Sequence, residues 1–305
     1  MAKNKTLIVI AGPTAIGKTA LAISLAQHFS TEIISADSRQ FFKEMNIGTA
    51  KPHADELAAA KHHFIDSHSI NTFFSTGDFE KEALQVLEEI FDRHDVAIMA
   101  GGSGLYLDAV TKGLDVLPDT DMQIRAALNL LFEKEGIEPI KAQLATADPD
   151  YYHKVDQANP QRMIRGLEFF LSTGQKVSSF LTNSKKERPF NMIKIGLNME
   201  RPLLYERINH RVDLMLKEGL LEEVKSLQPY KDLNALKTVG YAELFDYLDG
   251  KLSFDAAIDK IKQNTRRFAK RQLTWFRRDP EIFWFEPHPV ESIINFVKNK
   301  LNKTS

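Results

Sequence analysis

The sequence predicts an α/β protein, in which a doubly wound parallel sheet carries a phosphate-binding loop (P-loop) and is interrupted by a helical insertion domain. Three observations carry this prediction. An apolar run leads into a glycine-rich loop in IAGPTAIGKT, residues 10–19. Apolar segments then alternate with helical ones, which is typical of parallel strands joined by crossover helices. A long middle stretch has helical spacing and no convincing strand pattern.

The elements of the first part follow from their patterns. The run TLIVIAG is apolar throughout, as expected for a strand that is buried on both faces of a parallel sheet. The segment TGDFEKEALQVLEEIFDRH has helical spacing, with Thr76 as the predicted N-cap and acidic residues in its first turns. The expected order is strand 6–12, helix 18–29, strand 32–37, a weaker strand 62–67, helix 76–94, strand 95–104 and helix 105–113.

The pattern changes near Gly113. Beyond it, one helix is well marked, with Asn159 as N-cap, Pro160 at the first helical position and Gly174 at the stop. Strand character returns in MIKIGL, and long helical segments then run to the C-terminus. We therefore expect a core of residues 1–115 and 191–305, the second part mainly helical, with a helical insertion domain of residues 116–190 between them.

Composition narrows the class of protein. Hydrophobic residues make up 43% and charged residues 27%, which is typical of a globular chain. The net charge of −1 means that any contact with nucleic acid must come from a local basic patch. There is no Cys, which excludes disulfides, thiolate zinc sites and Cys nucleophiles. The N-terminal apolar run is too short for a signal peptide, and no stretch approaches a membrane span, so we expect a cytoplasmic protein.

The phosphate loop is the strongest functional signal. Its pattern G-x-x-x-x-G-K-[ST] is common in nucleotide-binding proteins, above all ATP-binding ones, because glycines let the backbone N–H groups point at phosphate oxygens. Lys18 adds a positive charge, Thr19 can ligate Mg²⁺, and the following helix aims its N-terminus at the anion. A chance match is the alternative, and a strand before the loop and a helix after it argue against one. The predicted phosphate-binding residues are Gly12, Pro13, Thr14, Ala15, Ile16, Gly17, Lys18 and Thr19.

The acid that usually accompanies such a loop is missing. A P-loop enzyme that transfers phosphoryl groups usually ends a later apolar strand in an acid that handles Mg²⁺ and water. Here VAIMA is followed by Gly101-Gly102, and the GTPase patterns N-K-x-D and D-x-x-G do not occur. This favours chemistry in which the phosphates leave as a unit.

Asp37, in ADSRQ, is the second signal. The alternative is a simple cap on the next segment. Because it follows the strand after the phosphate loop, it is expected at the same edge of the sheet as that loop. A carboxylate repels a diphosphate, so its suitable role is to accept a proton or hydrogen bond from a nucleophile.

The third signal is a basic helix near the C-terminus, in IKQNTRRFAKRQLTWFRRD. Ile261, Phe268 and Trp275 are expected to pack on one of its sides. A solvated face and a surface for phosphate backbone are both open for its charges, although acids are usually interspersed on solvated faces. Its cations are Lys262, Arg266, Arg267, Lys270, Arg271, Arg277 and Arg278.

A second basic cluster comprises Gln161, Arg162 and Arg165, on the first turns of the insertion helix. An ordinary salt-bridged helix is its alternative interpretation.

Together these pieces resemble the bacterial tRNA dimethylallyltransferases, also called tRNA isopentenyltransferases. The resemblance covers nearly the whole chain in the expected order, and GTAKP beside D-S-x-Q is not a general P-loop feature. The matching stretches are GPTAIGKT, ISADSRQFFKEMNIGTAKP, GGSGLYLDAV, NPQRMIRGLE, RINHRVDLMLKEGLLEEV, LKTVGYAELFDYLDG and TRRFAKRQLTWFRRD.

The resemblance implies an activity. The family transfers a dimethylallyl group from dimethylallyl diphosphate to the exocyclic amine of an adenine next to the tRNA anticodon, and diphosphate departs with Mg²⁺. The expected partners are therefore that diphosphate and the anticodon stem-loop of tRNA, and we expect a monomer and no membrane association.

The resemblance also implies roles for residues. Asp37, Thr14 and Arg211 are the expected catalytic residues, and Arg207 is expected to help bind the diphosphate. The adenine must leave its stack to reach such a site. The expected tRNA contacts are Asp37, Ser38, Arg39, Gln40, Ser103, Arg125, Gln161, Arg162, Met163, Ile164 and Arg165, to which the basic helix adds Arg266, Arg267, Lys270 and Arg271.

The sequence departs from the family pattern at several points. Ser103 stands where the Gly-Gly turn usually continues with Thr, and Phe41-Phe42 stand where a Tyr often follows D-S-x-Q. A chain without Cys cannot form the C-terminal zinc finger of many eukaryotic relatives.

Two other functions remain open. One is an isopentenyltransferase for free adenine nucleotides, which would need neither the insertion nor the basic helix. The other is a non-catalytic P-loop regulator that binds RNA, or a small-molecule kinase. The missing acid after VAIMA argues against a kinase.

Overall fold

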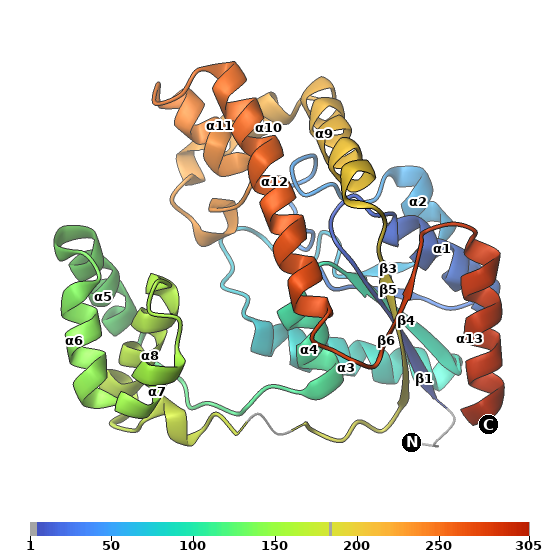
Figure 1. Cartoon of the computed structure of the whole chain (residues 1–305), viewed down its shortest axis with the longest axis horizontal. Coiled ribbons are helices and arrows are strands. Elements are labelled where there is room, and N and C mark those ends of the chain that lie inside the picture. The colour runs from blue at the N-terminus through green and yellow to red at the C-terminus, as the bar shows by residue number, and fades with distance from the viewer. Residues whose placement is uncertain (1–4, 183–184, 305) are drawn as a thin grey trace. The chain divides into compact units, whose positions relative to one another are not determined.

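The computed structural model describes residues 5–182 and 185–304, and the chain forms two compact units (Figure 1). The larger unit comprises Met1–Lys112 and Glu187–Ser305, and the smaller unit comprises Gly113–Lys186. The sequence placed these boundaries a few residues later, at 116–190.

The larger unit is built on one sheet of six strands, all parallel. The central strand, β1, pairs along its whole length with β4 on one side and β5 on the other. Across the sheet the order is β3 (His62–His63), β2 (Ile33–Ser35), β4 (Val96–Gly101), β1 (Thr6–Ala11), β5 (Asn191–Leu197) and β6 (Ile282–Phe285). The ends of β2, β4 and β1 therefore lie next to one another, at the edge where α/β sheets bind ligands.

The side chains of β1 explain why this strand is central. Leu7 and Val9 join one hydrophobic cluster, and Ile8 and Ile10 join a second cluster on the opposite face of the sheet. All four are at most 3% exposed. Since successive side chains of a strand point to opposite faces, a strand that is apolar at every position needs cover on both.

Helices supply that cover (Figure 1). On one face lie α1 and α13, whose Leu25 and Val297 pack into the same cluster as Ile8. On the other lie α3 and α4, whose Phe79 and Val110 pack with Val9. The bounds are α1 (Lys18–Phe29), α2 (Ala54–Ala59), α3 (Thr76–Arg93), α4 (Gly104–Lys112) and α13 (Val290–Thr304). The predicted doubly wound α/β fold is confirmed.

The second part of the larger unit adds helices between β5 and β6. The longest is α12, which buries Ile261, Ala269, Gln272 and Phe276 along one stripe. The elements are α9 (Arg201–Lys217), α10 (Leu220–Ser226), the 3₁₀ turns Gln228–Tyr230 and Asn234–Leu236, α11 (Tyr241–Leu248) and α12 (Phe254–Phe276).

Three sequence predictions about elements need correction. The N-cap of α3 is Ser75, which accepts a hydrogen bond from the Asp78 N–H, so Thr76 is already helical. The strand predicted over 32–37 ends at Ser35, which leaves Asp37 beyond it. The C-terminal part is mainly helical, as predicted, but a further strand was missed there, β6, which closes one edge of the sheet. This strand has only four residues, although its β-branched and aromatic run IFWF was a usable signal.

The smaller unit is helical in the residues that the structure describes. Its core gathers Leu128, Ile140, Leu144, Met163 and Leu167. The predicted caps of its one well-marked helix are confirmed, since Asn159 accepts from the Arg162 N–H, Pro160 opens the helix and Gly174 ends it. The elements are α5 (Met122–Glu135), α6 (Glu138–Ala147), α7 (Pro149–Lys154), α8 (Pro160–Thr173) and a 3₁₀ turn, Val177–Ser179.

Over residues 5–182 and 185–304, none of the helices combines the length and the apolar character that crossing a membrane requires.

Candidate active site

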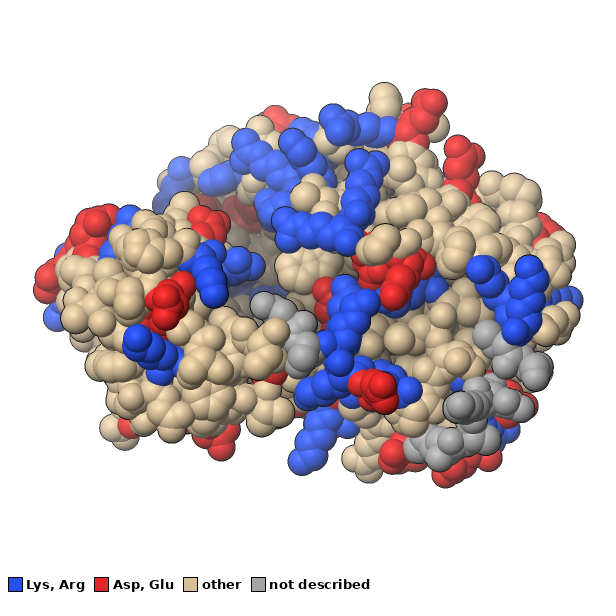
Figure 2. All heavy atoms as spheres, turned by 60° about the horizontal axis from the view of Figure 1, so that its bottom comes forward, with Lys and Arg blue, Asp and Glu red and all other residues tan. Residues whose placement is uncertain are grey.

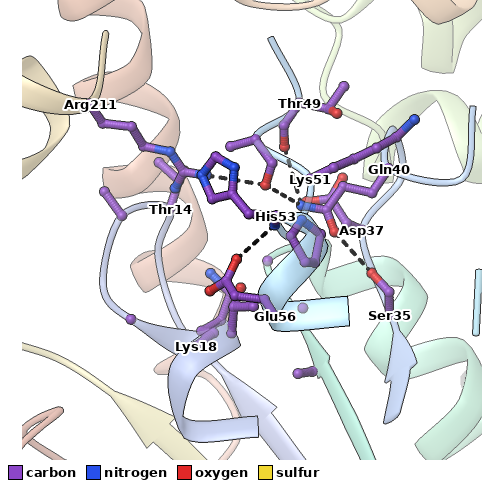
Figure 3. A pocket seen from close by; sticks show the side chains of 18 of the residues that line it. Thr14, Lys18, Ser35, Asp37, Gln40, Thr49, Lys51, His53, Glu56 and Arg211 are labelled. Carbon is purple, nitrogen blue, oxygen red and sulfur yellow. Dashed lines mark hydrogen bonds between the residues drawn. The ribbon is translucent and has the colours of Figure 1, made fainter. Parts of the chain in front are cut away.

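A cavity of about 1020 Å³ opens at the carboxyl ends of β1, β2 and β4 (Figure 3). Its walls come from the phosphate loop, the segment after β2, and the helices α9 and α12, all within the larger unit. Thr14, Lys18, Thr19, Asp37 and Arg211 all line it. The fold thus brings together the three side chains that the sequence analysis expected to be catalytic with the cation and hydroxyl of the phosphate loop.

The phosphate loop owes its shape to small residues. Gly17, the N-cap of α1, has a φ of 107°, which favours glycine, and Ala15 also has a positive φ of 64°. At Gly12 a Cβ would lie only 3.0 Å from the Leu197 carbonyl oxygen at the end of β5. The loop therefore turns sharply enough to aim the N-terminus of α1 into the cavity.

Lys18 is held by the loop itself, since its Nζ donates to the Pro13 carbonyl at 2.8 Å. The pKa of Lys18 is lowered to about 8, chiefly by burial and to a lesser extent by the nearby Arg211, while Asp37 opposes the shift. A bound diphosphate would favour the charged form, because an anion stabilises a neighbouring ammonium.

Asp37 lies two residues past β2 and lines the cavity. Its Oδ1 accepts a hydrogen bond from the Arg39 N–H at 2.9 Å. That bond is the local cap that the sequence analysis gave as the alternative role, and it coexists with the position in the cavity.

Two arginines of α9 reach backbone carbonyls around the cavity. Arg207 Nε donates to the Ala15 carbonyl of the phosphate loop at 2.9 Å, and Arg211 Nη2 lies 3.4 Å from the Ala50 carbonyl. Burial lowers the pKa of Arg211, while the charges of Asp37 and Glu56 raise it. Because an arginine keeps its proton under any ordinary condition, both side chains bring a permanent positive charge to the site.

The residues after Asp37 hold the neighbouring loops. The Ser38 N–H donates to Ser103 Oγ at 3.0 Å, which ties the segment after β2 to the turn after β4. Gln40 accepts from Ser35 Oγ at 3.1 Å and donates to the carbonyls of Thr49 and Ala50 (Figure 3).

The side chain of Arg39, two residues after Asp37, is half-buried. Its guanidinium donates to the carbonyls of Ser38 at 3.0 Å and Asn234 at 3.4 Å, and burial lowers its pKa.

Gln272 is a site residue that the sequence analysis missed. Its Oε1 accepts from the Thr14 N–H at 2.9 Å, and its Nε2 donates to the Gly102 carbonyl at 2.9 Å, so it joins the phosphate loop to the turn after β4. A Cβ at Gly102 would lie 2.3 Å from Gln272 Nε2, so a larger residue would displace this amide. The available signal was a polar residue within the apolar stripe of α12.

The cations of α12 divide into two kinds. Arg266 is half-buried, donates to Asn209 Oδ1 at 2.6 Å and lies over the Tyr205 ring. Arg267, Lys270 and Arg271 are exposed. Figure 2 shows Lys and Arg side chains gathered on the face of the larger unit that it presents.

The apolar side of α12 departs from expectation at one position. Ile261 is buried and Trp275 half-buried, as expected, but Phe268 is 38% exposed and lines the cavity.

The expected tRNA-contacting residues of the smaller unit also differ in exposure. Gln161 and Arg162 are exposed, whereas Met163 and Ile164 are buried in the core, so their side chains cannot meet a ligand at the surface. Arg165 Nη1 lies 3.1 Å from Glu168, as expected for a salt-bridged helix.

Arg125 binds the same carboxylate. Its Nε donates to Glu168 Oε2 at 2.9 Å, and Glu168 is fully buried. Arg125 and Arg165 therefore share one buried carboxylate.

The described side chains do not form a metal site by themselves. In the described part of the chain, no group of three or more His, Asp or Glu side chains is placed to hold a metal ion.

Comparison with known proteins adds the family. A sequence model described as IPP transferase matches residues 40–279. The chain is also 57% identical to a tRNA dimethylallyltransferase of Christiangramia forsetii, over 97% of this chain and 98% of that one. The chain belongs to the IPP transferase family.

Other relatives of this IPP transferase agree. A tRNA dimethylallyltransferase of Flavobacterium johnsoniae is 54% identical over 92% of this chain and 93% of that one. Among solved structures, the tRNA isopentenylpyrophosphate transferase of Bacillus halodurans is 37% identical with a TM-score of 0.73, and the match covers 98% of both chains. A eukaryotic dimethylallyltransferase described as acting on tRNA is 29% identical with a TM-score of 0.75, covering 92% of this chain and 73% of that one.

Membership of the IPP transferase family makes the chain an enzyme of prenyl transfer. It accounts for a phosphate loop without an acid at the end of β4, where Gly101 and Gly102 stand instead. A prenyl diphosphate carries its phosphates as a leaving group, so no water needs to be activated against them.

Proposed function

We propose that this IPP transferase moves a dimethylallyl group from dimethylallyl diphosphate to the exocyclic amine of the adenine adjacent to a tRNA anticodon. The observation that carries the proposal is one cavity lined by the phosphate loop, Asp37 and Arg211. The names of its relatives, tRNA dimethylallyltransferases, support the same substrates. In the reaction the adenine nitrogen forms a bond to the allylic carbon, the carbon–oxygen bond to diphosphate breaks, and the amine loses a proton.

The protein's role at the leaving group is electrostatic. Negative charge grows on the diphosphate as the carbon–oxygen bond breaks, and donors already in place stabilise it without reorganisation. Lys18, Arg211 and Arg207 supply positive charge around the cavity, and the loop amides and Thr14 supply hydrogen-bond donors. Arg207 contributes in a second way, because its bond to the Ala15 carbonyl holds the phosphate loop in shape.

Asp37 serves the nucleophile. An exocyclic adenine amine is a poor nucleophile, because its lone pair is delocalised into the ring. A carboxylate that accepts a hydrogen bond and then the proton raises electron density on the nitrogen as the new bond forms. The position of Asp37 in the cavity, at the end of β2, supports this role.

Mg²⁺ is proposed as the metal. Thr19 lines the cavity at the start of α1, where P-loop proteins place the hydroxyl that ligates Mg²⁺. Mg²⁺ usually takes one or two protein ligands, with the rest from substrate phosphates and water, so a single hydroxyl fits the ion. Its chemistry there would be to neutralise charge on the departing diphosphate.

For tRNA, the exposed cations Arg267, Lys270 and Arg271 on α12, together with Gln161 and Arg162 on α8, are the proposed contacts with the phosphate backbone. Asp37 to Gln40 and Ser103 would lie nearer the flipped base. Any contribution of Met163 and Ile164 would be indirect, through the packing of α8. A cytoplasmic monomer is the expected state of the enzyme and stays a prediction.

One experiment separates this function from its alternatives. The protein is incubated with dimethylallyl diphosphate and, separately, with tRNA, AMP or ATP, and nucleosides are then analysed by mass spectrometry. A dimethylallyl group on adenosine from tRNA alone is the expected result. Modification of AMP or ATP would indicate an enzyme for free nucleotides. No transfer, together with ATP turnover stimulated by RNA, would indicate the regulator instead.

A further inference from the structure

A loop with no assigned role forms one wall of the cavity. Asn46, Ile47, Thr49, Ala50 and Lys51 all line it. The loop is a tight turn, in which the Ala50 N–H donates to the Ile47 carbonyl at 2.9 Å and the Lys51 N–H to the Asn46 carbonyl at 3.3 Å. One end of such a turn presents backbone N–H groups, and the opposite end presents backbone carbonyl groups.

The N–H end is bound by one carboxylate, that of Glu223 on α10. Glu223 accepts from the N–H groups of Asn46 at 3.0 Å, Ile47 at 2.8 Å and Gly48 at 3.0 Å. Bonds from an N–H to an ionised carboxylate are about twice as strong as neutral ones. Three of them on consecutive residues therefore fix the turn as a unit.

Tyr241 on α11 contacts both Glu223 and the loop that Glu223 binds. Its hydroxyl donates to Glu223 Oε1 at 2.6 Å, and the side chain is fully buried. Burial and the neighbouring Glu223 raise the pKa of that hydroxyl, so it remains a donor. The ring lies against Gly48, where an added Cβ would come within 2.5 Å of it.

The carbonyl end of the turn faces two site residues. Gln40 Nε2 donates to the carbonyls of Thr49 at 3.2 Å and Ala50 at 3.0 Å, and Arg211 Nη2 lies 3.4 Å from the Ala50 carbonyl (Figure 3). Ala50 has a positive φ of 48°, a conformation that a non-glycine residue keeps only when its surroundings enforce it.

We propose that Glu223 is a positioning residue, which holds the loop 46–51 so that its carbonyls set Gln40 and Arg211 for the transfer reaction. Arg211 on α9 and Glu223 on α10 contact opposite ends of this loop. The two helices are joined through Gly219, which has a φ of 104°. The role of Arg211 rests on the proposed function, whereas the dependence of Arg211 on Glu223 is a matter of geometry. Misplacing a clamp by about 1 Å can cost on the order of 100-fold in rate.

The test is Glu223→Gln, which keeps the size of the side chain but removes its charge. The matched control is Glu222→Gln on the same helix, because Glu222 is 69% exposed and pairs only with Lys225 among the ion pairs of the described residues. For each variant we would measure the melting temperature, the affinity for inorganic pyrophosphate by calorimetry, and the single-turnover transfer rate at saturating tRNA and dimethylallyl diphosphate. All kinetic and binding measurements are made well below the melting temperature.

We expect Glu223→Gln to weaken pyrophosphate binding and to slow single-turnover transfer by roughly 10- to 100-fold, with tRNA affinity unchanged. Glu222→Gln should match the wild type in every measurement. A residue with a merely structural role would change the melting temperature and leave the rate of the folded protein intact. That outcome, a folded Glu223→Gln with wild-type rate and pyrophosphate affinity, would overturn the proposal.

A second variant decides the case if Glu223→Gln does not fold. Tyr241→Phe keeps the ring against Gly48 and removes the hydroxyl that donates to Glu223. We expect the same pattern of losses, smaller in size, and wild-type values would again overturn the proposal. Pyrophosphate binding needs no turnover, so a wild type that fails to modify tRNA would refute the proposed function without deciding the role of Glu223.

Discussion

The phosphate loop, residues 12–19, and the loop 46–51 line the same cavity but hold their shapes by different means. The phosphate loop relies mainly on its own sequence: Gly17 provides a positive φ, and Lys18 Nζ binds the Pro13 carbonyl. The loop 46–51 is bound by Gln40 on one side and by Glu223 on the other. A site can thus combine one loop that its own residues specify with another that depends on residues far along the chain.

The difference is one of degree. Arg207 and Gln272 also reach the phosphate loop from distant helices. Those two contacts add to a loop whose shape is already set by its own glycines and by the start of α1. Glu223, by contrast, satisfies three N–H groups at once, so the turn that it binds has no local substitute for it.

The largest expected effect is at Asp37, which lines the same cavity as the two loops. Asp37→Asn should slow the chemical step by about 10²–10⁴, the usual contribution of a positioned general base. The amide keeps an oxygen that can accept from the Arg39 N–H, so the local turn should survive. Single-turnover transfer with labelled dimethylallyl diphosphate measures the effect, alongside direct binding of tRNA and pyrophosphate, which should change far less.

The control for that variant is Asp55→Asn, which changes an exposed carboxylate in the first turn of α2. It should transfer at the wild-type rate. If Asp37→Asn also does so, Asp37 is only a cap, and the proton leaves to water or to another group.

Glycine substitutions test the comparison of the two loops directly. Gly17→Ala strains the backbone, whereas Gly48→Ala meets the ring of Tyr241. We expect Gly48→Ala to destabilise the protein by about 1–3 kcal/mol, the usual cost of overpacking. In a Tyr241→Leu background that cost should fall by about 1 kcal/mol, since the effects of substitutions at two contacting residues on the free energy of unfolding are not additive. The wild type, the two single variants and the double variant form a double-mutant cycle. Chemical denaturation of the four proteins of the cycle measures the coupling.

The same cycle with Gly17→Ala is the control, because no replacement of Tyr241 relieves a backbone strain. Its cost should be equal in both backgrounds. Equal costs for Gly48→Ala as well would mean that the loop 46–51 adapts locally, and the contrast between the two loops would not hold.

The pH dependence of pyrophosphate binding tests the phosphate loop. Burial lowers the pKa of Lys18 to about 8, so the free protein loses this positive charge as the pH rises through that value. Affinity for pyrophosphate should therefore fall above about pH 8, approaching tenfold per pH unit. Asp37 and Arg211 are the charged groups that act on Lys18 in the cavity, and the guanidinium of Arg211 keeps its proton across this range.

Lys18→Arg provides the control, because a guanidinium stays charged at these pH values. Its pyrophosphate affinity, even if lower, should lack the fall that deprotonation of Lys18 causes above about pH 8. An equally steep fall in this variant would assign the pH dependence to another group.

The smallest expected effect is at the surface of α12. Arg267→Ala combined with Arg271→Ala should weaken tRNA binding and spare pyrophosphate binding, because both side chains are exposed. Each lost phosphate contact should reduce the slope of log affinity against log salt by roughly 0.7–0.9. The control replaces two exposed lysines of other helices, Lys81→Ala with Lys298→Ala. An unchanged slope in the α12 variant would identify its cations as a solvated face.

Much of the fold could be predicted because its signals are local. The continuous apolar run of β1 requires cover on both faces, and the caps Asn159, Pro160 and Gly174 mark α8 without reference to the rest of the chain. The edge strand β6 was missed because four residues carry too little periodicity to stand out between helices.

The site shows the same division. The glycines, Lys18 and Thr19 by themselves determined a phosphate loop, since backbone conformation and charge act over a few residues. What the sequence could not determine is which distant groups meet it, because a hydrogen bond between Gln272 and Thr14, or between Glu223 and Ile47, exists only once helices and loops have packed. The family match names the reaction, and the tertiary structure decides which side chains hold the loops in place for it.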